Sequence, residues 1–387
     1  MKIAVIGVKA MPAIQGGIER HAEELYTRLA ARGHEVTVFC RSYATDNYRE
    51  YKGVRIKGLP SINTKHLDTI TNVLLSSILT VFGDYDIVHY HAIGPSLLSF
   101  IPRIKKRTKV ITTVHGLDWQ RKKWGRFAKV SLKLGEKSTA IFSDTVITVS
   151  RDLTNYFQNK YPKCRVQYIP NGICEPNKRK PTKALSSWGI QPMKYILYAG
   201  RLVPEKGCHN LIKAFSEVKT NIGLVIAGAE SHSRDYALSL KNMAKEDPRI
   251  VFTGFISGPP LEELFSNALG FVLPSELEGL PISLLEALSY GLPSICSDIP
   301  PHVEVSLICE DKSSGILLFE SGNIEQLRDQ LRQLFRSHNK LRQEVLAARP
   351  AILREYDWDR IASLTEDTYF SLQKESILSR MIEKARV

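Results

Sequence analysis

The feature of this sequence that most constrains its fold is a series of short, continuously apolar segments separated by helix-length stretches. Such segments occur at residues 3–7, 36–40, 87–89, 110–114, 146–149, 195–200, 224–228 and 271–273. A parallel strand that is covered on both faces has this continuous apolar character, whereas a half-exposed strand alternates between apolar and polar residues. The pattern therefore predicts the α/β class, with doubly wound, largely parallel sheets.

The order strand, helix, strand begins twice along the 387 residues. Strand 3–7 leads into a loop, a helix that ends at Gly33 and strand 36–40. Strand 195–200 likewise leads into a loop and a helix near 210–219. Helices of this length between parallel strands are typical of Rossmann-like domains. We therefore expect two such domains facing a cleft, which suits a chain of this length.

The domain boundaries follow from composition. The segment "EPNKRKPTK" from residue 175 is polar, basic and contains two prolines, as interdomain connections often are. We predict a first domain at residues 1–175, a linker at 176–190 and a second domain at 191–356. Residues 357–387 have helical spacing of apolar side chains, and we expect them to form a helix that packs back toward the first domain.

Charge is distributed unevenly along the chain. The net charge is +13, and residues 1–180 contain 30 basic and 14 acidic side chains, net +16. Basic runs at residues 103–109 and 121–129 suit an anionic membrane surface, or simply solvated helix faces. No recognition motif supports nucleic acid. The apolar stretch at 73–82 is too short to span a bilayer, and the six scattered cysteines suggest reduced thiols. We expect a cytoplasmic protein, peripheral at the inner face of the membrane.

Ligands of α/β proteins bind beyond the carboxyl ends of strands, so the loops that follow strands are the candidate sites. In the first half, Gly16 and Gly17 precede a helix whose free N–H groups can bind phosphate, although plain turn chemistry is an alternative. After strand 110–114, His115 lies beside Asp118. The neighbouring Trp119 and Arg121 form an acceptor surface or, alternatively, anchor a helix.

Two loops of the second half suit a nucleotide. Arg201 and Lys206 follow strand 195–200, where two cations can hold a diphosphate and neutralise it as it leaves. The spacing alone is unspecific, and the position in the fold supports the interpretation. Phe255 and Ile256 follow the strand that ends near residue 252, and this loop is expected to frame the base through backbone contacts.

The segment "EGLPISLLE" carries two carboxylates at different places. Pro281 is a suitable first residue of a helix, so Glu278 precedes the helix and Glu286 lies within it. Ionised carboxylates accept hydrogen bonds from sugar or ribose hydroxyls. We expect the two glutamates to contact two parts of one ligand, and the backbone N–H groups of Gly279 and Leu280 to face a phosphate.

Three patterns suggest metal ligands, but their positions argue against this role. The DxD sequences at residues 84–86 and 357–359 precede a strand and open a helix, so turn and N-cap roles are favoured for these aspartates. His89 and His91 alternate at the end of one strand, and no third ligand is evident nearby in sequence. We therefore predict no metal and no other cofactor.

Taken in order, the motifs "QGGIERHAEEL", "HGLD", "IPNGI", "GRLVPEKG" and "EGLPISLLEALSYGLP" resemble the family-4 retaining glycosyltransferases with the two-domain GT-B fold. The resemblance spans nearly the whole chain. It implies that the first domain takes the acceptor and the second the nucleotide-sugar donor.

The resemblance also implies roles for single residues. Gly16 and Gly17 match the loop at the donor phosphates, and His115 matches the histidine that contacts the transferred sugar. Asn171 and Gly172 match a motif near the hinge. Arg201 and Lys206 match the basic pair at the diphosphate, and Glu278 and Glu286 match the glutamates that contact the sugar and the ribose.

The family likeness further implies retention of anomeric configuration without a metal. The reaction expected is transfer of a hexosyl group from a nucleotide-diphosphate sugar to a lipid-linked or saccharide acceptor in cell-surface polysaccharide or cell-wall synthesis. A UDP-sugar is favoured over GDP-mannose as the donor. One alternative is a UDP-sugar 2-epimerase, against which the tandem of Arg-x4-Lys and E-x7-E weighs. A second alternative is a non-catalytic, membrane-docked partner subunit.

Overall fold

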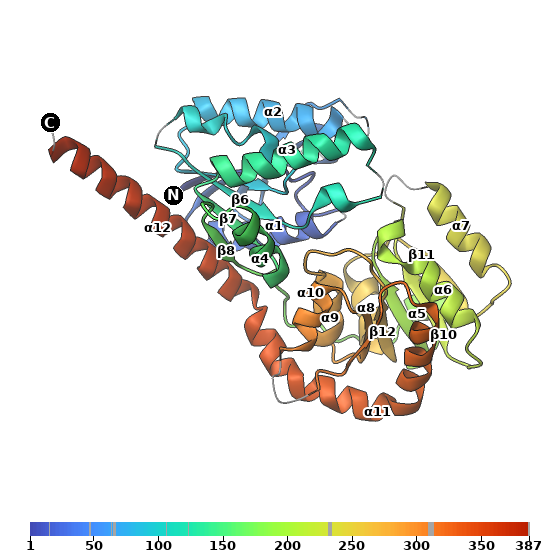
Figure 1. Ribbon diagram of the computed structural model, residues 1–387. Helices are drawn as coiled ribbons and strands as arrows, with labels where there is room; N and C mark the ends of the chain where they lie inside the picture. Colours follow the sequence, from blue (N-terminus) through green and yellow to red (C-terminus); the bar gives the residue numbers. More distant parts are fainter. Residues whose placement is uncertain are drawn as a thin grey trace. The chain divides into compact units, whose positions relative to one another are not determined.

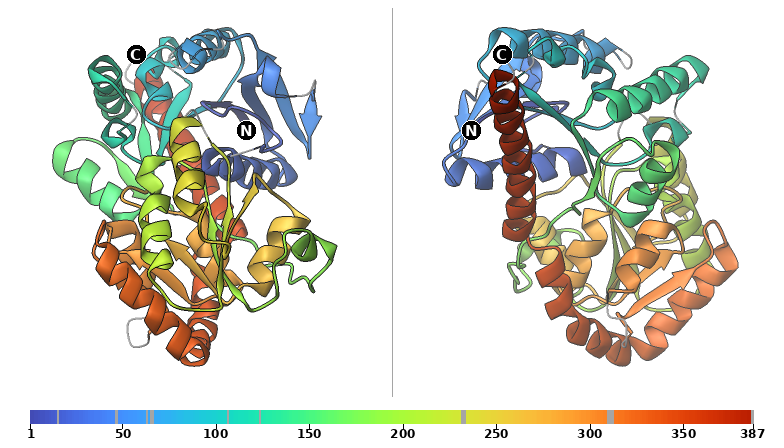
Figure 2. Two further views of the ribbon diagram at one scale, coloured as in Figure 1. Left: turned by 90° about the vertical axis from the view of Figure 1, so that its right-hand side faces the viewer. Right: turned by 60° about the vertical axis from the view of Figure 1, so that its left-hand side comes forward.

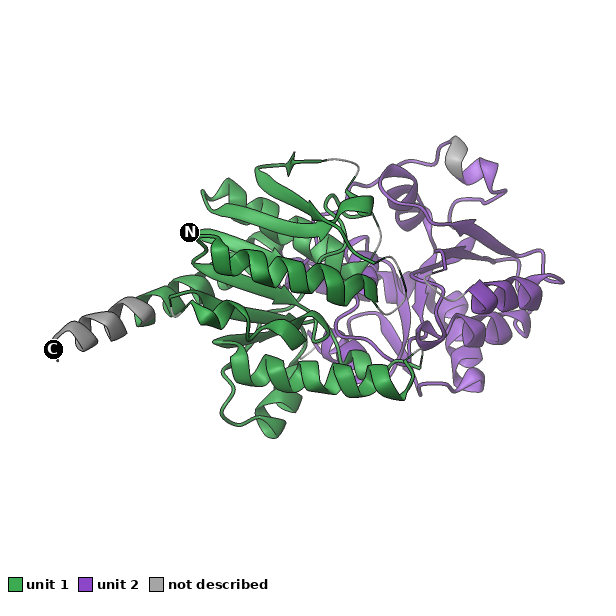
Figure 3. Ribbon diagram, turned by 90° about the horizontal axis from the view of Figure 1, so that it is seen from above, with its two compact units in different colours: residues 1–171, 358–387 green, residues 172–357 purple. Residues whose placement is uncertain are grey.

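The computed structural model describes residues 1–14, 16–45, 48–62, 64, 67–105, 107–122, 124–230, 234–308 and 313–385. The chain divides into two compact units (Figure 3). The first unit comprises residues 1–171 and 358–387, and the second comprises residues 172–357. Gln15, Lys106, Lys123 and Cys309, which belong to sequence patterns considered above, lie outside the described residues.

The first unit contains an eight-stranded sheet in the order β3-β4-β2-β1-β5-β6-β7-β8, parallel except for the pair β3 and β4. Strands β6, β7 and β8 of this sheet are labelled in Figure 1, together with helices α1, α2, α3 and α4. Its strands are β1 (Lys2–Ile6), β2 (Glu35–Arg41), β3 (Glu50–Tyr51), β4 (Val54–Leu59), β5 (Ile87–His91), β6 (Lys109–Val114), β7 (Thr145–Thr148) and β8 (Val166–Tyr168). Its helices are α1 (Gly17–Ala31), α2 (Leu67–Phe82), α3 (Arg126–Phe142), α4 (Arg151–Lys160) and α12 (Trp358–Ala385), with short 3-10 turns η1 (Ser42–Ala44), η2 (Pro95–Leu98), η3 (Pro102–Ile104) and η4 (Asp118–Gln120).

Helix α12 completes the core of the first unit (Figure 2). Trp358, Ile361 and Tyr369 are buried in one cluster with side chains of β1 and α1. At the surface of the unit, Arg28 of α1 donates a hydrogen bond to Asp359 of α12 at 2.9 Å. The prediction that a C-terminal helix packs back toward the N-terminal domain is therefore confirmed.

The second unit contains a six-stranded parallel sheet in the order β11-β10-β9-β12-β13-β14. Its strands are β9 (Tyr195–Ala199), β10 (Gly223–Ala227), β11 (Ile250–Gly254), β12 (Gly270–Leu273), β13 (Ser294–Ser297) and β14 (Ile316–Phe319). Its helices are α5 (Lys183–Ser187), α6 (Cys208–Ser216), α7 (Arg234–Ala244), α8 (Pro259–Asn267), α9 (Ile282–Ser289), α10 (Pro300–Ser306) and α11 (Ile324–Glu355), with the turn η5 (Pro204–Lys206).

The chain passes between the units twice, after Asn171 and after Asp357. Ile173 N donates to Tyr356 O at 2.7 Å, so the two passing segments are joined by a backbone hydrogen bond. Residues 176–190, which the sequence predicts to be a linker, belong to the second unit, where Thr182 N donates to Glu263 of α8 at 2.6 Å.

The continuous apolar segments all form strands, because side chains on both faces of these strands are buried. The α/β class with two Rossmann-like sheets is confirmed. Several expected boundaries were wrong: α6 spans Cys208–Ser216 rather than residues 210–219, and β11 ends at Gly254 rather than near residue 252. Helix α9 begins at Ile282, and Pro281 is its extended N-cap residue rather than its first residue. Among the described residues, no helix is both long enough and apolar enough to cross a membrane.

Candidate active site

In the second unit, the order of strands reverses between β9 and β12. The chain continues from β9 outward to β10 and β11, and from β12 outward in the other direction to β13 and β14. Ligands of doubly wound proteins bind at the carboxyl ends of the strands where the order reverses, which here are β9 and β12. Arg201 and Lys206 follow β9, and Glu278 follows β12.

The structure brings Lys206 and Glu278 together in this place. Lys206 Nζ donates to Glu278 Oε1 at 2.5 Å, and Ser275 Oγ donates to the same oxygen at 2.7 Å. Only 13% and 10% of the Lys206 and Glu278 side chains are exposed. Burial by itself raises the pKa of Glu278, but the charge and hydrogen bond of Lys206 outweigh it and hold the pKa below its usual value. Glu278 is therefore an ionised, acceptor-only group at neutral pH.

A glycine allows the two loops to approach so closely. Gly207 has φ of +66°, and a Cβ at this position would lie 2.0 Å from the carbonyl oxygen of Pro274. Glu276 N also donates to Glu205 O at 2.9 Å, which links the loop after β12 to the turn η5. Any side chain at position 207 would thus separate Lys206 from Glu278.

His302 of α10 belongs to the same group of polar side chains, although the sequence did not indicate it. Its Nδ1 donates to the Ser297 carbonyl oxygen at 2.9 Å, and its buried Nε2 has no hydrogen-bond partner among the described residues. Burial lowers the pKa of His302 to about 4, which the nearby Glu278 carboxylate partly counteracts. The only sequence signal was its place shortly after a buried strand, β13.

The other residues predicted in the second unit lie before or within α9, after β11 and after β9. Gly279 and Leu280 are buried just before α9, and Glu286 is half-buried within it. Phe255 is 46% exposed directly after β11, and Ile256 follows it. Arg201 is half-buried, and its carbonyl oxygen accepts from Tyr198 Oη at 3.1 Å.

The first unit has its own reversal of strand order, between β1 and β5. A Cβ on Gly7, which follows β1 with φ of +100°, would lie 2.5 Å from the carbonyl oxygen of His91 at the end of β5. Gly16 is the N-cap residue of α1 with φ of 111°, and the exposed Gly17 opens that helix. The glycine pair thus lies at a helix N-terminus, as the sequence predicts.

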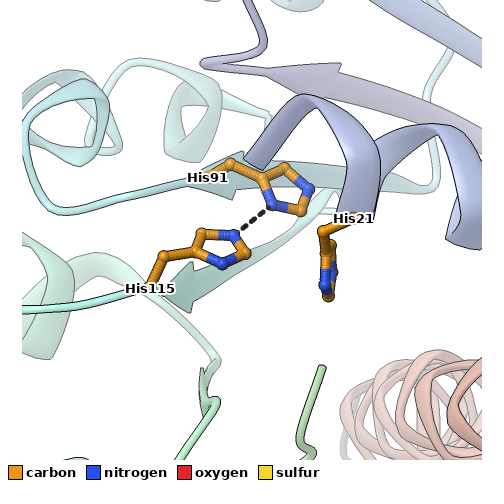
Figure 4. A group of neighbouring side chains, drawn as sticks. All are labelled: His21, His91 and His115. Carbon is orange, nitrogen blue, oxygen red and sulfur yellow. Dashed lines mark hydrogen bonds between the residues drawn. The ribbon is translucent and has the colours of Figure 1, made fainter. Parts of the chain in front are cut away.

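His115 lies directly after β6 and belongs to a histidine cluster formed by His21, His91 and His115 (Figure 4). His91 Nδ1 and His115 Nε2 share a hydrogen bond of 2.9 Å, and His91 Nε2 bonds to Tyr26 Oη at 2.6 Å. Burial and the neighbouring His21 and His89 hold the pKa of His115 well below its usual value. His21 and Tyr26 were not indicated by the sequence, since they lie on the buried face of an ordinary amphipathic helix.

The predicted acceptor residues have structural contacts. Trp119 Nε1 donates to the buried Glu136 at 2.7 Å, and Asp118 and Arg121 form an ion pair at 3.0 Å. Glu136 also accepts from Lys160 at 2.6 Å and from two tyrosines. This geometry favours the alternative interpretation of Trp119 as an anchor of helix α3.

The aspartates of the two DxD sequences also have protein partners. Asp84 pairs with Lys2 and with Arg107, and Asp86 accepts from Lys2 N at 2.8 Å. Asp359 accepts from Arg28, and Asp357 bridges to Ile173. These contacts agree with the structural roles expected for the DxD aspartates.

Two doubly wound sheets, each with polar side chains gathered where its strand order reverses, define the class of nucleotide-binding α/β proteins. The family model of glycosyltransferase family 4 matches residues 15–174, and the model of glycosyl transferases group 1 matches residues 185–349. The chain therefore belongs to the family 4, group 1 glycosyltransferases, which are retaining enzymes of the GT-B fold that use nucleotide-sugar donors.

Individual relatives agree with this assignment. An uncharacterized glycosyltransferase of Methanocaldococcus jannaschii, MJ1607, is 27% identical and covers 95% of this chain and 98% of its own. The sucrose-phosphate synthase of Thermosynechococcus elongatus has a TM-score of 0.82 at 20% identity, over 96% of this chain and 98% of that chain. HepE of Anabaena, solved in complex with UDP-glucose, has a TM-score of 0.78 at 16% identity, over 96% of this chain and 100% of that chain.

Proposed function

We propose that this glycosyltransferase moves a hexosyl group from a UDP-sugar to a lipid-linked or saccharide acceptor of cell-surface polysaccharide synthesis, without a metal ion. The observation that carries the proposal is the buried pair of Lys206 and Glu278, on the loops that follow β9 and β12 of the second unit. A cation and an acceptor-only carboxylate in contact are suited to the diphosphate and the sugar hydroxyls of one donor. The similarity to a protein solved with UDP-glucose favours uridine as the base.

The chemistry assigned to the pair follows from its charge. In the reaction the bond from the anomeric carbon to the diphosphate oxygen breaks, and a bond from that carbon to the acceptor oxygen forms on the same face. The proton of the acceptor hydroxyl passes to the departing phosphate. Lys206 stabilises the negative charge that develops on the diphosphate, and its ammonium has three donors, so it can contact both the phosphate and Glu278.

The test is nucleotide release from UDP-, GDP- and ADP-sugars, measured with a crude lipid or oligosaccharide acceptor and with or without EDTA. We expect release from a UDP-sugar that EDTA does not abolish. Glu278→Gln removes the charge but keeps the shape, and we expect a loss of at least ~100-fold in kcat/KM. Full activity of Glu278→Gln would show that the site is assigned wrongly, and loss of activity in EDTA would overturn the metal-free mechanism.

We also propose that the first unit binds an anionic membrane surface, where a lipid-linked acceptor would lie. Exposed apolar side chains recur at helical spacing along α3, and exposed basic residues flank them; these are Phe127, Val130, Leu134 and Ile141, with Arg126, Lys133 and Lys137. Phe127 is 92% exposed, which is costly in water for a side chain of this size. Apolar and cationic groups on one helix are the combination that binds anionic lipid.

Vesicle sedimentation tests the membrane proposal. The protein should sediment with phosphatidylglycerol vesicles at low salt and less at high salt, because salt screens the cationic contribution. Phe127→Ser should weaken binding, and the matched control Leu238→Ser, at a 52% exposed position of α7 in the second unit, should not. Equal partitioning onto neutral and anionic vesicles would contradict the electrostatic part of the proposal.

A further inference from the structure

The histidine cluster has the composition of a metal site. His91 ends β5, His115 follows β6 directly, and His21 extends from α1 (Figure 4). One ring nitrogen of each lies within 4.8 Å of the other two. Three converging imidazoles are the ligand set of zinc sites that keep one position for water. The sequence showed no third ligand for His89 and His91, because His21 of α1 and His115, which follows β6, lie 70 and 24 residues from His91 along the chain.

In two of the three rings, those of His21 and His91, the nitrogen that faces away from the cluster already has a hydrogen-bond partner, as in metal sites. A metal-bound histidine usually donates its other N–H to a neighbouring oxygen, which fixes the ring and its tautomer. His21 Nδ1 lies 3.0 Å from Asn171 Oδ1, and since that oxygen can only accept, Nδ1 carries the proton. Its Nε2 therefore carries a lone pair, and this buried atom has no hydrogen-bond partner among the described residues.

His91 is oriented in the same manner. Its Nε2 lies 2.6 Å from Tyr26 Oη, and its Nδ1 faces His115. When Nδ1 binds a cation, Nε2–H donates to the tyrosine oxygen, so this contact is retained. Among the hydrogen bonds of the described residues, a cation between the rings replaces the one of 2.9 Å between His91 and His115.

The protonation state and access of the cluster also suit a cation. Metal binding needs neutral imidazole. Burial lowers the pKa of His21 to about 4, and burial with the neighbouring histidines holds the pKa of His91 and His115 well below the usual value. His21 and His91 are fully buried, whereas part of His115 is exposed to solvent.

We propose that His21, His91 and His115 bind one divalent cation of the Zn²⁺ type. An all-imidazole site selects Zn²⁺, Cu²⁺ or Ni²⁺ over Mg²⁺ and Mn²⁺, which prefer oxygen ligands. The cation binds a ring nitrogen of His115, the side chain expected to contact the transferred sugar, and so makes that nitrogen unavailable to the sugar. Bound Zn²⁺ is thus an inhibitor of transfer, a consequence that rests on the function proposed above.

Binding is tested with the metal alone. Full-length protein is freed of metal by chelation and titrated with Zn²⁺ by calorimetry, and Co²⁺ is added as a visible reporter of tetrahedral nitrogen coordination. We expect one site per chain. His21→Ala should reduce the affinity by more than 100-fold, and Asn171→Leu by about 10- to 100-fold, because the first removes a ligand and the second only its support.

The matched control is His34→Gln, a histidine of the same unit that bonds to Glu366 at 2.7 Å and lies outside the cluster. This variant should bind Zn²⁺ as the wild-type protein does. X-ray absorption of the wild-type protein with Zn²⁺ bound provides a reading that needs no variant, and it should show three imidazole ligands. Equal Zn²⁺ affinity of wild-type and folded His21→Ala protein, or an absorption spectrum dominated by oxygen ligands, would overturn the inference.

The outcomes separate this site from the proposed function. If the protein releases UDP from a donor and binds no Zn²⁺, the metal inference fails while the function stands. If Zn²⁺ binds at the cluster and leaves nucleotide release unchanged, the metal site stands and the inhibitory consequence fails, together with the role of His115 at the sugar.

Discussion

Replacing Lys206 by methionine should destabilise the second unit by about 3 kcal/mol, because it leaves the Glu278 carboxylate buried without its cation. Breaking a buried ion pair from one side costs about 3–5 kcal/mol. The lower end applies here, since the pair is 13% and 10% exposed and water can partly reach it. After the change, Ser275 Oγ, 2.7 Å from the carboxylate, is the hydrogen-bond donor that remains of the two described above.

The pH dependence of this loss has a definite sign. In the wild-type protein the pKa of Glu278 is lowered, so its contribution to stability is complete above the unfolded pKa near 4.5 and is lost as the pH falls through the folded pKa. Without Lys206, burial dominates and raises the pKa of Glu278 above that of the unfolded chain. The variant then gains stability as the pH falls toward 5, and the difference between the two proteins becomes smaller.

The assay is amide hydrogen exchange of the β9 and β12 peptides at increasing urea concentration. It gives the free energy of unfolding of the second unit separately from that of the first. Lys213→Met, an exposed lysine on α6, is the matched control and should change stability by less than 0.5 kcal/mol. The double variant Lys206→Met with Glu278→Gln should lose at least about 1.5 kcal/mol less than the sum of the two single variants. Strictly additive losses, or a loss that does not shrink at pH 5, would refute the reasoning.

Three further predictions concern other parts of the fold. Trp358→Ala should cost about 3–5 kcal/mol in the first unit and leave exchange of β9 and β12 unchanged, because this indole is 2% exposed in the core that α12 completes. Gly207→Ala should abolish UDP binding measured by calorimetry, because the added Cβ cannot lie 2.0 Å from the Pro274 oxygen and the loop must move. Unchanged binding would show that the close contact between the loops after β9 and β12 is not needed to bind UDP. In metal-free protein, the free energy that protects β1 from hydrogen exchange should fall as the pH drops below about 6.5 toward 4, by about 1.4 kcal/mol per pH unit for each histidine. The reason is that burial lowers the pKa of His21 to about 4 and the pKa of His89 to about 3, so the unfolded chain takes up the protons first. A flat profile between pH 7 and 5 would contradict this prediction.

The sequence was sufficient for the architecture because the strands are buried on both faces. Continuous apolar segments such as residues 110–114 and 271–273 admit few other interpretations, and their alternation with helices determines the fold class. Strands such as β13, with the sequence SICS, and the two-residue β3 were not predicted. Each contains a single residue that strongly favours strands, Ile295 in β13 and Tyr51 in β3, which is too weak a pattern to predict a strand.

The candidate site was predictable in part, for a similar reason. Lys206 and Glu278 could be assigned to one ligand because both follow strands of the same sheet, but their direct contact depends on the approach of loops 72 residues apart. His21 could not be found from its pattern. It lies on the buried face of α1, where a histidine has the same spacing as the apolar residues around it, and only the packing of α1 in the folded unit brings it to His91 and His115.

The discontinuous core of the first unit has a consequence for the order in which the protein folds on the ribosome. Domains usually fold as they emerge, the N-terminal one first. Here the strands of the first unit are made early, but Trp358, Ile361 and Tyr369 reach them only after the whole second unit has been translated. We therefore expect the nascent first unit to expose the apolar surface that α12 later covers, for as long as the second unit is being translated. A chaperone that binds apolar surface should then bind nascent chains of intermediate length and release them once α12 emerges.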